Sequence, residues 1–527
     1  MIIHGDHDDP NNNIHNLTYF LEARIRPHEQ DRPLYIYNPM LLPLNVDTLD
    51  CDSILQDLGM DNKTKVGGVG VASYIALYRV SNLGNCHGPG RGVPETYWNY
   101  LGIALLDGDL NILPRDTDTD TDDEYQYLDI VIDLNKDLSD IGWSPKSPDG
   151  LVGQHHNHSH VIEEDEPVKQ YMQDCQLIAV PSSSTAERSK ADKLILICNN
   201  YAMEVRLERT SSSSSSPPPS SESINHNGAA ILFTNTYGSG LQLTATTLPK
   251  AIVKGGKNLH YFQVTDEERE GTGFLDQGRS GRDVGGGYLE IWPGGPHELM
   301  RIDFTDPSRN NVKALIKSKL PEPDATFITV DGADSKQPLI ARDSGSACCI
   351  SISWRDESDD DDDDDDVEGP SERRLLLGFS HRKTRRGLGK ANPPYNYVSR
   401  MYAFEPTPPF NIVARSGYFC LGFALKKQQQ QHHTQQKPYV HDNDEANESD
   451  NEQVWGAANE YKLTINDIIF ENCPAIHFVT GIAEKLGDEE HTAIISYGVN
   501  DCYPRMVEVS KKFLVSLLRP LSSTTRG

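Results

Sequence analysis

The apolar residues of this chain fall mostly in short runs, bounded by Gly, Pro, Asn and Asp, that alternate with polar residues or are apolar throughout. Such runs are typical of β-strands, and their punctuation is typical of turns. The predicted strands are 72–82, 99–107, 128–134, 175–181, 193–201, 202–208, 229–235, 288–292, 298–304, 347–354, 374–382, 398–405, 475–481 and the two halves of 493–509.

Helical periodicity is scarce. The clearest case is 510–521, where Phe513, Leu514, Leu517 and Leu518 have helix-like spacing and Pro520 lies near the end. A weaker helix is predicted at 314–320. The pattern therefore predicts an all-β fold with a short C-terminal helix.

One theme recurs along the chain: an apolar strand ends in polar residues and a second strand follows. The five pairs are 75–82 with 99–107, 194–201 with 202–208, 288–297 with 298–304, 375–382 with 398–405, and 493–501 with 506–510. A further short strand precedes the second, fourth and fifth pairs, at 175–180, 347–353 and 475–481. Five repeats of three or four antiparallel strands predict a five-bladed β-propeller.

Low-complexity segments interrupt this pattern, and each lies between strand-like segments. They predict long loop insertions in a single domain, because surface loops tolerate added length at small entropic cost. The predicted organisation is a tail at 1–30, one propeller at 31–518 and a tail at 519–527. The insertions are expected at about 114–126, 153–168, 209–226, 356–371 and 427–453.

The net charge of −29, from 78 acidic and 49 basic residues, argues against a nucleic-acid partner. No window approaches 18 consecutive apolar residues, so no membrane span is expected. The N-terminus has no basic segment followed by an apolar one, which favours a cytoplasmic protein. The secretory pathway is the alternative if the N-terminus is incomplete. The oligomeric state stays open.

The nine cysteines are scattered, odd in number and without a CxxC pair. They are expected to be small buried hydrophobes in a reducing compartment rather than a disulfide framework. No HExxH or paired Cys/His pattern predicts a zinc site. The tract at 153–160 contains four histidines but is interpreted as an adventitious loop. No metal and no cofactor are expected.

In a propeller the inner strands of all blades are arranged around one axis. The polar ends of these strands would therefore lie together on one face. The candidates for that face are Arg79, Asn82, Asp174, Asn199, Asn200, His297, His381, Arg382, Asn500 and Asp501, with Tyr201, Trp292 and Tyr497 as nearby aromatics. Each residue alone is most simply a turn residue. Together they predict a pocket for a polyhydroxylated ligand, since sugars need many hydrogen bonds and a ring to stack on.

Several of these stretches resemble a known family. MQDCQLIAV, KLILICNNY, LLLGFSHRK, PPFNIVARSGYF, AIHFVTGI and HTAIISYGVNDCYPRMVEV are similar to the later blades of glycan-active five-bladed propellers. This group includes arabinanase-like hydrolases, inverting β-mannoside phosphorylases and mannosidases, and uncharacterised relatives associated with glycosyltransferases. The resemblance spans roughly residues 30–518.

The resemblance implies roles for individual residues. Asp174 matches the acidic position of a Glu-Asp-Pro-Arg-like motif, His381 and Arg382 match a Gly-His-Arg-like turn, and Tyr497, Asn500 and Asp501 match the turn of the last blade. The chain departs from the first motif, with Gln173, Cys175 and Gln176 in place of Glu, Pro and Arg. The segment 341–350 stands where relatives have a Gly-Gly-Thr-Pro-like sequence.

The implied activity is inverting glycosyl transfer or hydrolysis of a glycoside or sugar phosphate by two carboxyl groups, Asp174 and Asp501, which such a mechanism separates by ~6.5–9.5 Å. Asp283 and Glu290 are alternatives for the second carboxylate. His381 and Arg382 would bind sugar hydroxyls or an anionic group, and Tyr497 would stack on a sugar or pack in its blade. The alternative is a non-catalytic propeller that binds glycans or proteins, which the altered motif favours.

Overall fold

The computed structural model describes the chain as a set of strands and their nearest turns. The described residues are 2–3, 14–16, 35–45, 72–81, 99–112, 129–133, 174–180, 193–199, 201–209, 231–233, 241–245, 250–252, 258–264, 287–293, 297–302, 304, 314–317, 343–355, 372–385, 395–421, 476–499, 501 and 503–521. The predicted insertions at 114–126, 153–168, 356–371 and 427–453, and nearly all of 209–226, lie outside these residues.

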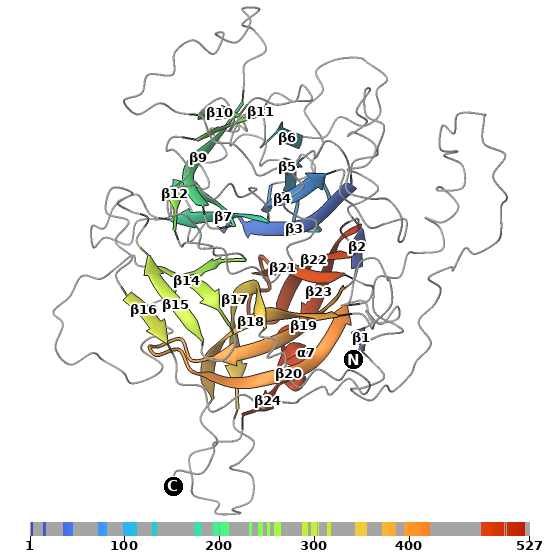
Figure 1. Ribbon diagram of the computed structural model, residues 1–527. Coiled ribbons are helices and arrows are strands. Elements are labelled where there is room, and N and C mark those ends of the chain that lie inside the picture. Colours follow the sequence, from blue (N-terminus) through green and yellow to red (C-terminus); the bar gives the residue numbers. More distant parts are fainter. Residues whose placement is uncertain are drawn as a thin grey trace, which may run out of the picture.

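The described strands form five sheets, which follow one another along the chain (Figure 1). The first sheet contains β3 (Tyr35–Pro43), β4 (Tyr74–Ser81), β5 (Asn99–Leu106) and β6 (Asp129–Asp133). The second contains β7 (Cys175–Val180), β8 (Lys193–Cys198), β9 (Tyr201–Arg209), β10 (Ile231–Phe233), β11 (Leu241–Ala245) and β12 (Lys250–Ala251). The third contains β13 (His260–Phe262), β14 (Gly287–Trp292), β15 (Glu298–Ile302) and β16 (Ala314–Lys317).

The last two sheets also take strands from the N-terminal segment. The fourth contains β17 (Ser344–Trp354), β18 (Arg373–Arg385), β19 (Tyr395–Phe404), β20 (Ile412–Leu421) and β24 (Arg519–Pro520), with β1 (Ile2–Ile3) parallel to β20. The fifth contains β21 (His477–Glu484), β22 (Thr492–Val499) and β23 (Tyr503–Ser510). Its outer strand is β2 (Ile14–Asn16), which pairs antiparallel with β23.

When β1 and β2 are set aside, the first strand of each sheet in chain order forms one edge of that sheet. The second and third strands in chain order lie beside it in the same order. These edge strands contact their neighbours: β3 lies against β7 and β21, and β17 lies against β13 and β21. The second and third sheets share a hydrophobic cluster that includes Ile195, Leu289 and Met300. Each sheet therefore packs on the next, and the fifth packs back on the first.

The core consists of apolar side chains between adjacent sheets. The largest cluster joins the fourth and fifth sheets through Leu377, Phe379, Ile495 and Val507, which expose almost no surface. Alternate residues of β18 face opposite neighbours, since Leu376 packs toward β13 and β14 while Leu375 and Leu377 pack toward β21–β23. Burial on both faces explains the nearly continuous apolar runs of the second strands.

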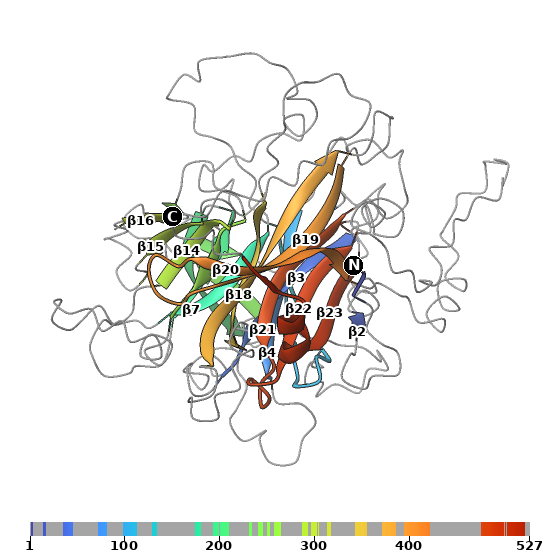
Figure 2. The same ribbon diagram turned by 90° about the horizontal axis from the view of Figure 1, so that it is seen from below.

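The short helix α7 (Lys511–Ser516) follows β23 and packs on β17 and β23 (Figure 2). Leu514 is its main buried residue, and Lys511 donates to Glu484 at 2.7 Å and to the carbonyl of Ser351 at 2.8 Å. The predicted C-terminal helix is confirmed, with a shorter span. The weaker helix predicted at 314–320 is wrong, because Ala314–Lys317 pairs with β15 as β16.

The cysteine prediction also needs correction. Cys175 and Cys198 form a disulfide between β7 and β8, where the strand register places them opposite each other. The sequence does not reveal this pair because its partners are 23 residues apart and meet only through strand pairing.

Candidate functional site

Strand direction brings most of the described candidates to one end of the sheets. The first strand of each sheet begins where the second strand ends, because the two are antiparallel. Arg79 lies near the end of β4, His381 and Arg382 lie in the last part of β18, and Asp174 directly precedes β7. We call this set of strand ends the polar end. Asn82, Asn200, Asn500 and Asp283 lie outside the described residues.

Asp174 is held at the boundary between the first two sheets. Its Oδ1 accepts a hydrogen bond from Asn38 Nδ2 at 2.8 Å and lies 3.7 Å from Arg79 NH1. The Arg79 guanidinium also stacks on the Tyr37 ring, with its carbon 5.1 Å from the centroid. The carboxylate is therefore oriented by two neighbours from the first sheet while 23% of its side chain stays exposed.

A second oriented carboxylate, Asp343, directly precedes β17. Its Oδ1 accepts from Arg382 Nε at 2.7 Å and from the Tyr418 hydroxyl at 2.8 Å, and its Oδ2 lies 3.8 Å from Arg400 NH1. Both guanidinium groups pack on the Tyr418 ring. Burial and the neighbouring Asp343 raise the pKa of Tyr418. The hydroxyl therefore stays protonated and donates a hydrogen bond to the carboxylate.

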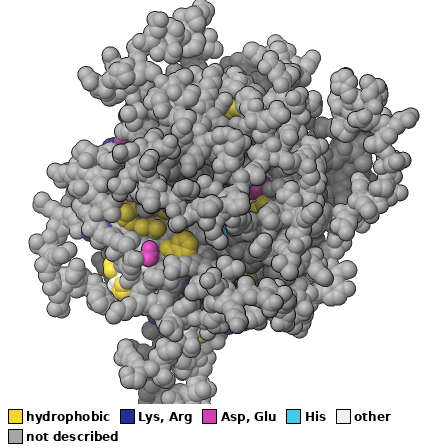
Figure 3. Space-filling model, in the orientation of Figure 1, with side chains coloured by type: hydrophobic (Ala, Val, Ile, Leu, Met, Phe, Trp, Pro, Cys, Tyr) yellow, Lys and Arg dark blue, Asp and Glu magenta, His cyan; other side chains and the backbone are white. Residues whose placement is uncertain are grey.

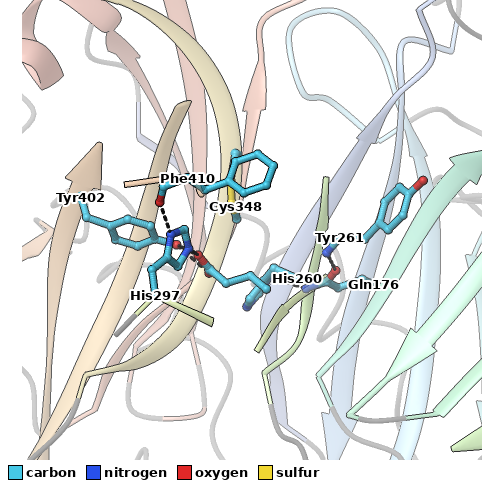
Figure 4. Close-up of a disulfide and its surroundings, with 9 residues drawn as sticks. Gln176, His260, Tyr261, His297, Cys348, Tyr402 and Phe410 are labelled. Atoms are coloured by element: carbon cyan, nitrogen blue, oxygen red, sulfur yellow. Dashed lines mark hydrogen bonds and ion pairs between the residues drawn. A yellow bond between two sulfur atoms is a disulfide. The ribbon is translucent and has the colours of Figure 1, made fainter. Parts of the chain in front are cut away.

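Glu290 and His297 form a fully buried pair between the third and fourth sheets (Figure 4). His297 donates from Nδ1 to the carbonyl of Phe410 at 2.9 Å, and its Nε2 lies 2.8 Å from Glu290 Oε1. Tyr402 donates its hydroxyl to the same carboxylate at 2.6 Å. The pKa of Tyr402 is raised well above its ordinary value by burial and by Glu290. The Glu290 carboxyl group thus contacts both His297 and Tyr402, out of reach of solvent.

His260 and Gln176 form a second buried polar contact, between β13 and β7 (Figure 4). The side-chain amide of Gln176 donates to His260 Nδ1, and its oxygen accepts the backbone N–H of Tyr261 at 3.4 Å. Burial, and secondarily the nearby His381, lower the pKa of His260 to about 3. The imidazole is therefore neutral, with its hydrogen on Nε2 because Nδ1 accepts.

His381 and Tyr497 lie in the packed interior of the polar end. His381 stacks on Tyr397 and meets the ring of Phe478 edge-on, with centroids 4.9 Å apart. Tyr497 has no exposed surface and packs beside His477, so it has the packing role rather than a free ring face. Burial raises the pKa of Tyr497. His297 is equally enclosed.

Asn199 and Asp501 occupy equivalent hairpins at the polar end. Asn199 lies between β8 and β9, and Asp501 lies between β22 and β23. Both have positive φ, 52° in each case, which Asn and Asp tolerate better than most residues. Asp501 is partly exposed. The positive φ explains why Asn or Asp, rather than an apolar residue, stands in the turn after each buried strand.

Sequence reasoning missed several residues of this end, above all Asp343, Arg400 and Tyr418. One signal was present, since Asp343 directly precedes the first strand of its sheet in the same way as Asp174. The other two lie on β19 and β20, and β20 was not predicted as a strand.

On the face seen in Figure 3, hydrophobic side chains gather over the region of β14 and β15 beside an acidic side chain.

No family model matches the chain, and no curated protein matches it. Among the described residues, no helix is long and apolar enough to cross a membrane. Within the same part of the chain, no three His, Cys, Asp or Glu side chains lie close enough together to hold a metal ion.

Proposed function

We propose that the five sheets are the blades of a five-bladed β-propeller. Three features support this arrangement. Each sheet begins with an edge strand that contacts the edge strands of its neighbours, the fifth sheet packs on the first, and β2 from the N-terminal segment completes the fifth sheet. In a propeller, such a shared outer strand closes the ring, and the polar end becomes one mouth of the central channel.

We propose further that this mouth acts on a glycoside or sugar phosphate by inverting, carboxylate-assisted transfer or hydrolysis. The observation that carries the proposal is the oriented and partly exposed carboxylate of Asp174, which opens the first strand of the second blade at the polar end. Asp501 adds a partly exposed carboxyl group at the same end of the fifth blade. In the proposed mechanism Asp174 and Asp501 share the acid and base roles, with the nucleophile between them.

Arg79 and Asn38 would keep Asp174 directed at the ligand, while Arg382 and Asn199 would bind hydroxyl groups. Localisation in the cytoplasm and a carbohydrate partner remain predictions of the same account.

A non-catalytic glycan-binding or protein-binding propeller is the second candidate. One observation favours it. The carboxylates of Asp174 and Asp343 each accept a hydrogen bond from a protein side chain and lie within ion-pair distance of an arginine. Carboxylates held in this way can bind sugar hydroxyls without transferring a proton.

A substrate screen separates the two candidates. The wild-type chain, Asp174→Asn and Asp501→Asn are incubated with β-mannosides, arabinosides and sugar phosphates, and both binding and product formation are measured. The matched control is Asp109→Asn, an exposed acid in the turn after β5, at the opposite strand ends. Turnover by the wild type that is lost in both Asp174→Asn and Asp501→Asn supports the enzymatic proposal. Binding without turnover in the wild type supports the second candidate.

A further inference from the structure

Three arginines gather around one aspartate on the fourth sheet. Arg382 lies on β18, Arg400 on β19 and Arg415 on β20, and Asp343 is the acidic group that contacts the first two. We call Arg382, Arg400, Arg415 and Tyr418 the arginine cluster. Its side chains come from β18, β19 and β20 and lie on the face of the sheet that also carries Tyr402.

The cluster is largely enclosed. The side chains of Arg382 and Arg400 are 19% and 22% exposed, and that of Asp343 is 8% exposed. Tyr418 lies between the two arginines, whose guanidinium carbons are 4.7 and 4.9 Å from its ring centroid. Arg400 also donates from Nε to the carbonyl of Ser416 at 2.8 Å, which fixes its direction.

Arg415 is the member of the cluster with a guanidinium nitrogen left over for a ligand. Its NH2 atom is buried and has no hydrogen-bond partner among the described residues. Burial, and next the charge of Arg400, lower the pKa of Arg415. Enclosed cations are costly unless they are paired and hydrogen-bonded, and among the described residues only the Asp343 carboxylate is shown beside the three guanidinium groups.

We propose that the arginine cluster binds a phosphate-class oxyanion, with Arg415 and Arg400 as its principal donors. A guanidinium presents a planar fork of N–H donors that matches the oxygen atoms of a phosphate group. Asp343 and the Tyr418 ring hold two of the forks in place before the anion arrives. Anion binding here does not depend on the proposed glycosyl transfer, because it requires no bond to break.

The test compares thermal unfolding of the full-length chain in inorganic phosphate and in chloride at matched ionic strength, with titration calorimetry for affinity. We expect phosphate to raise the unfolding temperature of the wild type above its value in chloride. Arg415→Gln should weaken phosphate binding at least tenfold, and in chloride it should be as stable as the wild type or more stable, because it removes an enclosed charge that Arg400 repels. Arg355→Gln is the control, since Arg355 is 72% exposed at the far end of β17.

Titration of a hexose 1-phosphate identifies the source of the anion. Tighter binding than inorganic phosphate assigns the cluster to a sugar phosphate, and equal binding assigns it to free phosphate. Calorimetry on the wild type keeps the proposal testable even if a variant does not fold. The proposal is overturned if phosphate and chloride have the same effect on the wild type, or if Arg415→Gln binds phosphate as tightly as Arg355→Gln. Glycoside turnover is measured separately, so its absence does not affect this result.

Discussion

The Nε2 atom of His297 lies 2.8 Å from Oε1 of Glu290, and neither side chain exposes any surface. Tyr402 of the fourth sheet donates to the same carboxylate, and His297 also donates to the carbonyl of Phe410. Glu290 and His297 belong to the third sheet and its turn, whereas Tyr402 and Phe410 belong to the fourth sheet and its loop. The buried carboxylate thus links two adjacent sheets.

Glu290→Gln should destabilise the fold by about 1–3 kcal/mol, the usual cost of leaving a buried polar group without its partner. In glutamine one carboxylate oxygen becomes an NH2 group, which cannot accept from the Tyr402 hydroxyl, so Tyr402 loses one of the two acceptor oxygens that it contacts at 2.6 Å. Urea unfolding measures the loss. Glu372→Gln is the control, since Glu372 is half exposed and lies 3.9 Å from Arg355. Equal stability of the two variants would contradict the linking role.

Asp343→Asn should lower the free energy of unfolding by about 3 kcal/mol. Asp343 accepts from Arg382 and Tyr418 and faces Arg400, so the neutral amide removes the negative charge that the two guanidinium groups share. Because the loss is partly electrostatic, added salt should reduce it. Denaturant unfolding at two salt concentrations tests this, and a salt-independent loss would argue for a packing role instead.

Mild acid should destabilise the chain through its buried neutral histidines. His477 accepts the Leu421 N–H at Nε2 and contacts Ser399 Oγ from Nδ1, and burial lowers its pKa from 6.5 to about 3. Between these values the unfolded chain binds a proton that the folded chain does not, so the free energy of unfolding falls as the pH falls. The slope is about 1.4 kcal/mol per pH unit for each such group, and His260 adds a second.

His477→Gln should therefore be less stable at pH 7 but lose less stability between pH 6.5 and pH 5. His491→Gln is the control, because His491 is exposed in the turn before β22. Denaturant unfolding across this pH range gives both slopes. A slope in His477→Gln as steep as in the control variant would show that His477 does not titrate as described.

Gly102 of β5 lies opposite Tyr78 of β4, and a Cβ at this glycine would overlap the tyrosine ring. Gly102→Ala should cost about 1–3 kcal/mol, the usual range for overpacking a core. Gly417→Ala is matched to it, since no atom lies within 4 Å of a Cβ at Gly417 in β20. Thermal unfolding of the two variants should therefore differ, and equal midpoints would contradict the tight approach of Tyr78.

The sequence predicts the second and third strands of every sheet, because their apolar runs are long and end in polar residues. It misses β3 and β13, the edge strands of the first and third sheets. Pro39 and Asn38 interrupt β3, and β13 has only three residues, so neither has a recognisable period. It also misses β20, where Arg415, Ser416 and Gly417 interrupt the apolar run of the strand.

The candidate site is harder to predict because its contacts come from strand pairing and sheet packing. Asp174 could be selected from the sequence, but its partners Asn38 and Arg79 come from another sheet, more than 90 residues earlier. The same holds for Glu290 and Tyr402, which are 112 residues apart. Spacing along the chain carries no trace of such contacts when the intervening loops vary in length.

The most direct test of the proposed activity follows the anomeric configuration of the first product by proton NMR during turnover of β-mannosides and arabinosides. Asp501→Asn keeps a residue suited to the positive φ of that turn, so it removes the charge with little change in backbone preference. We predict an inverted product from the wild type and from Asp109→Asn, and none from Asp501→Asn. Undiminished turnover by Asp501→Asn, or a product of retained configuration, would contradict the account.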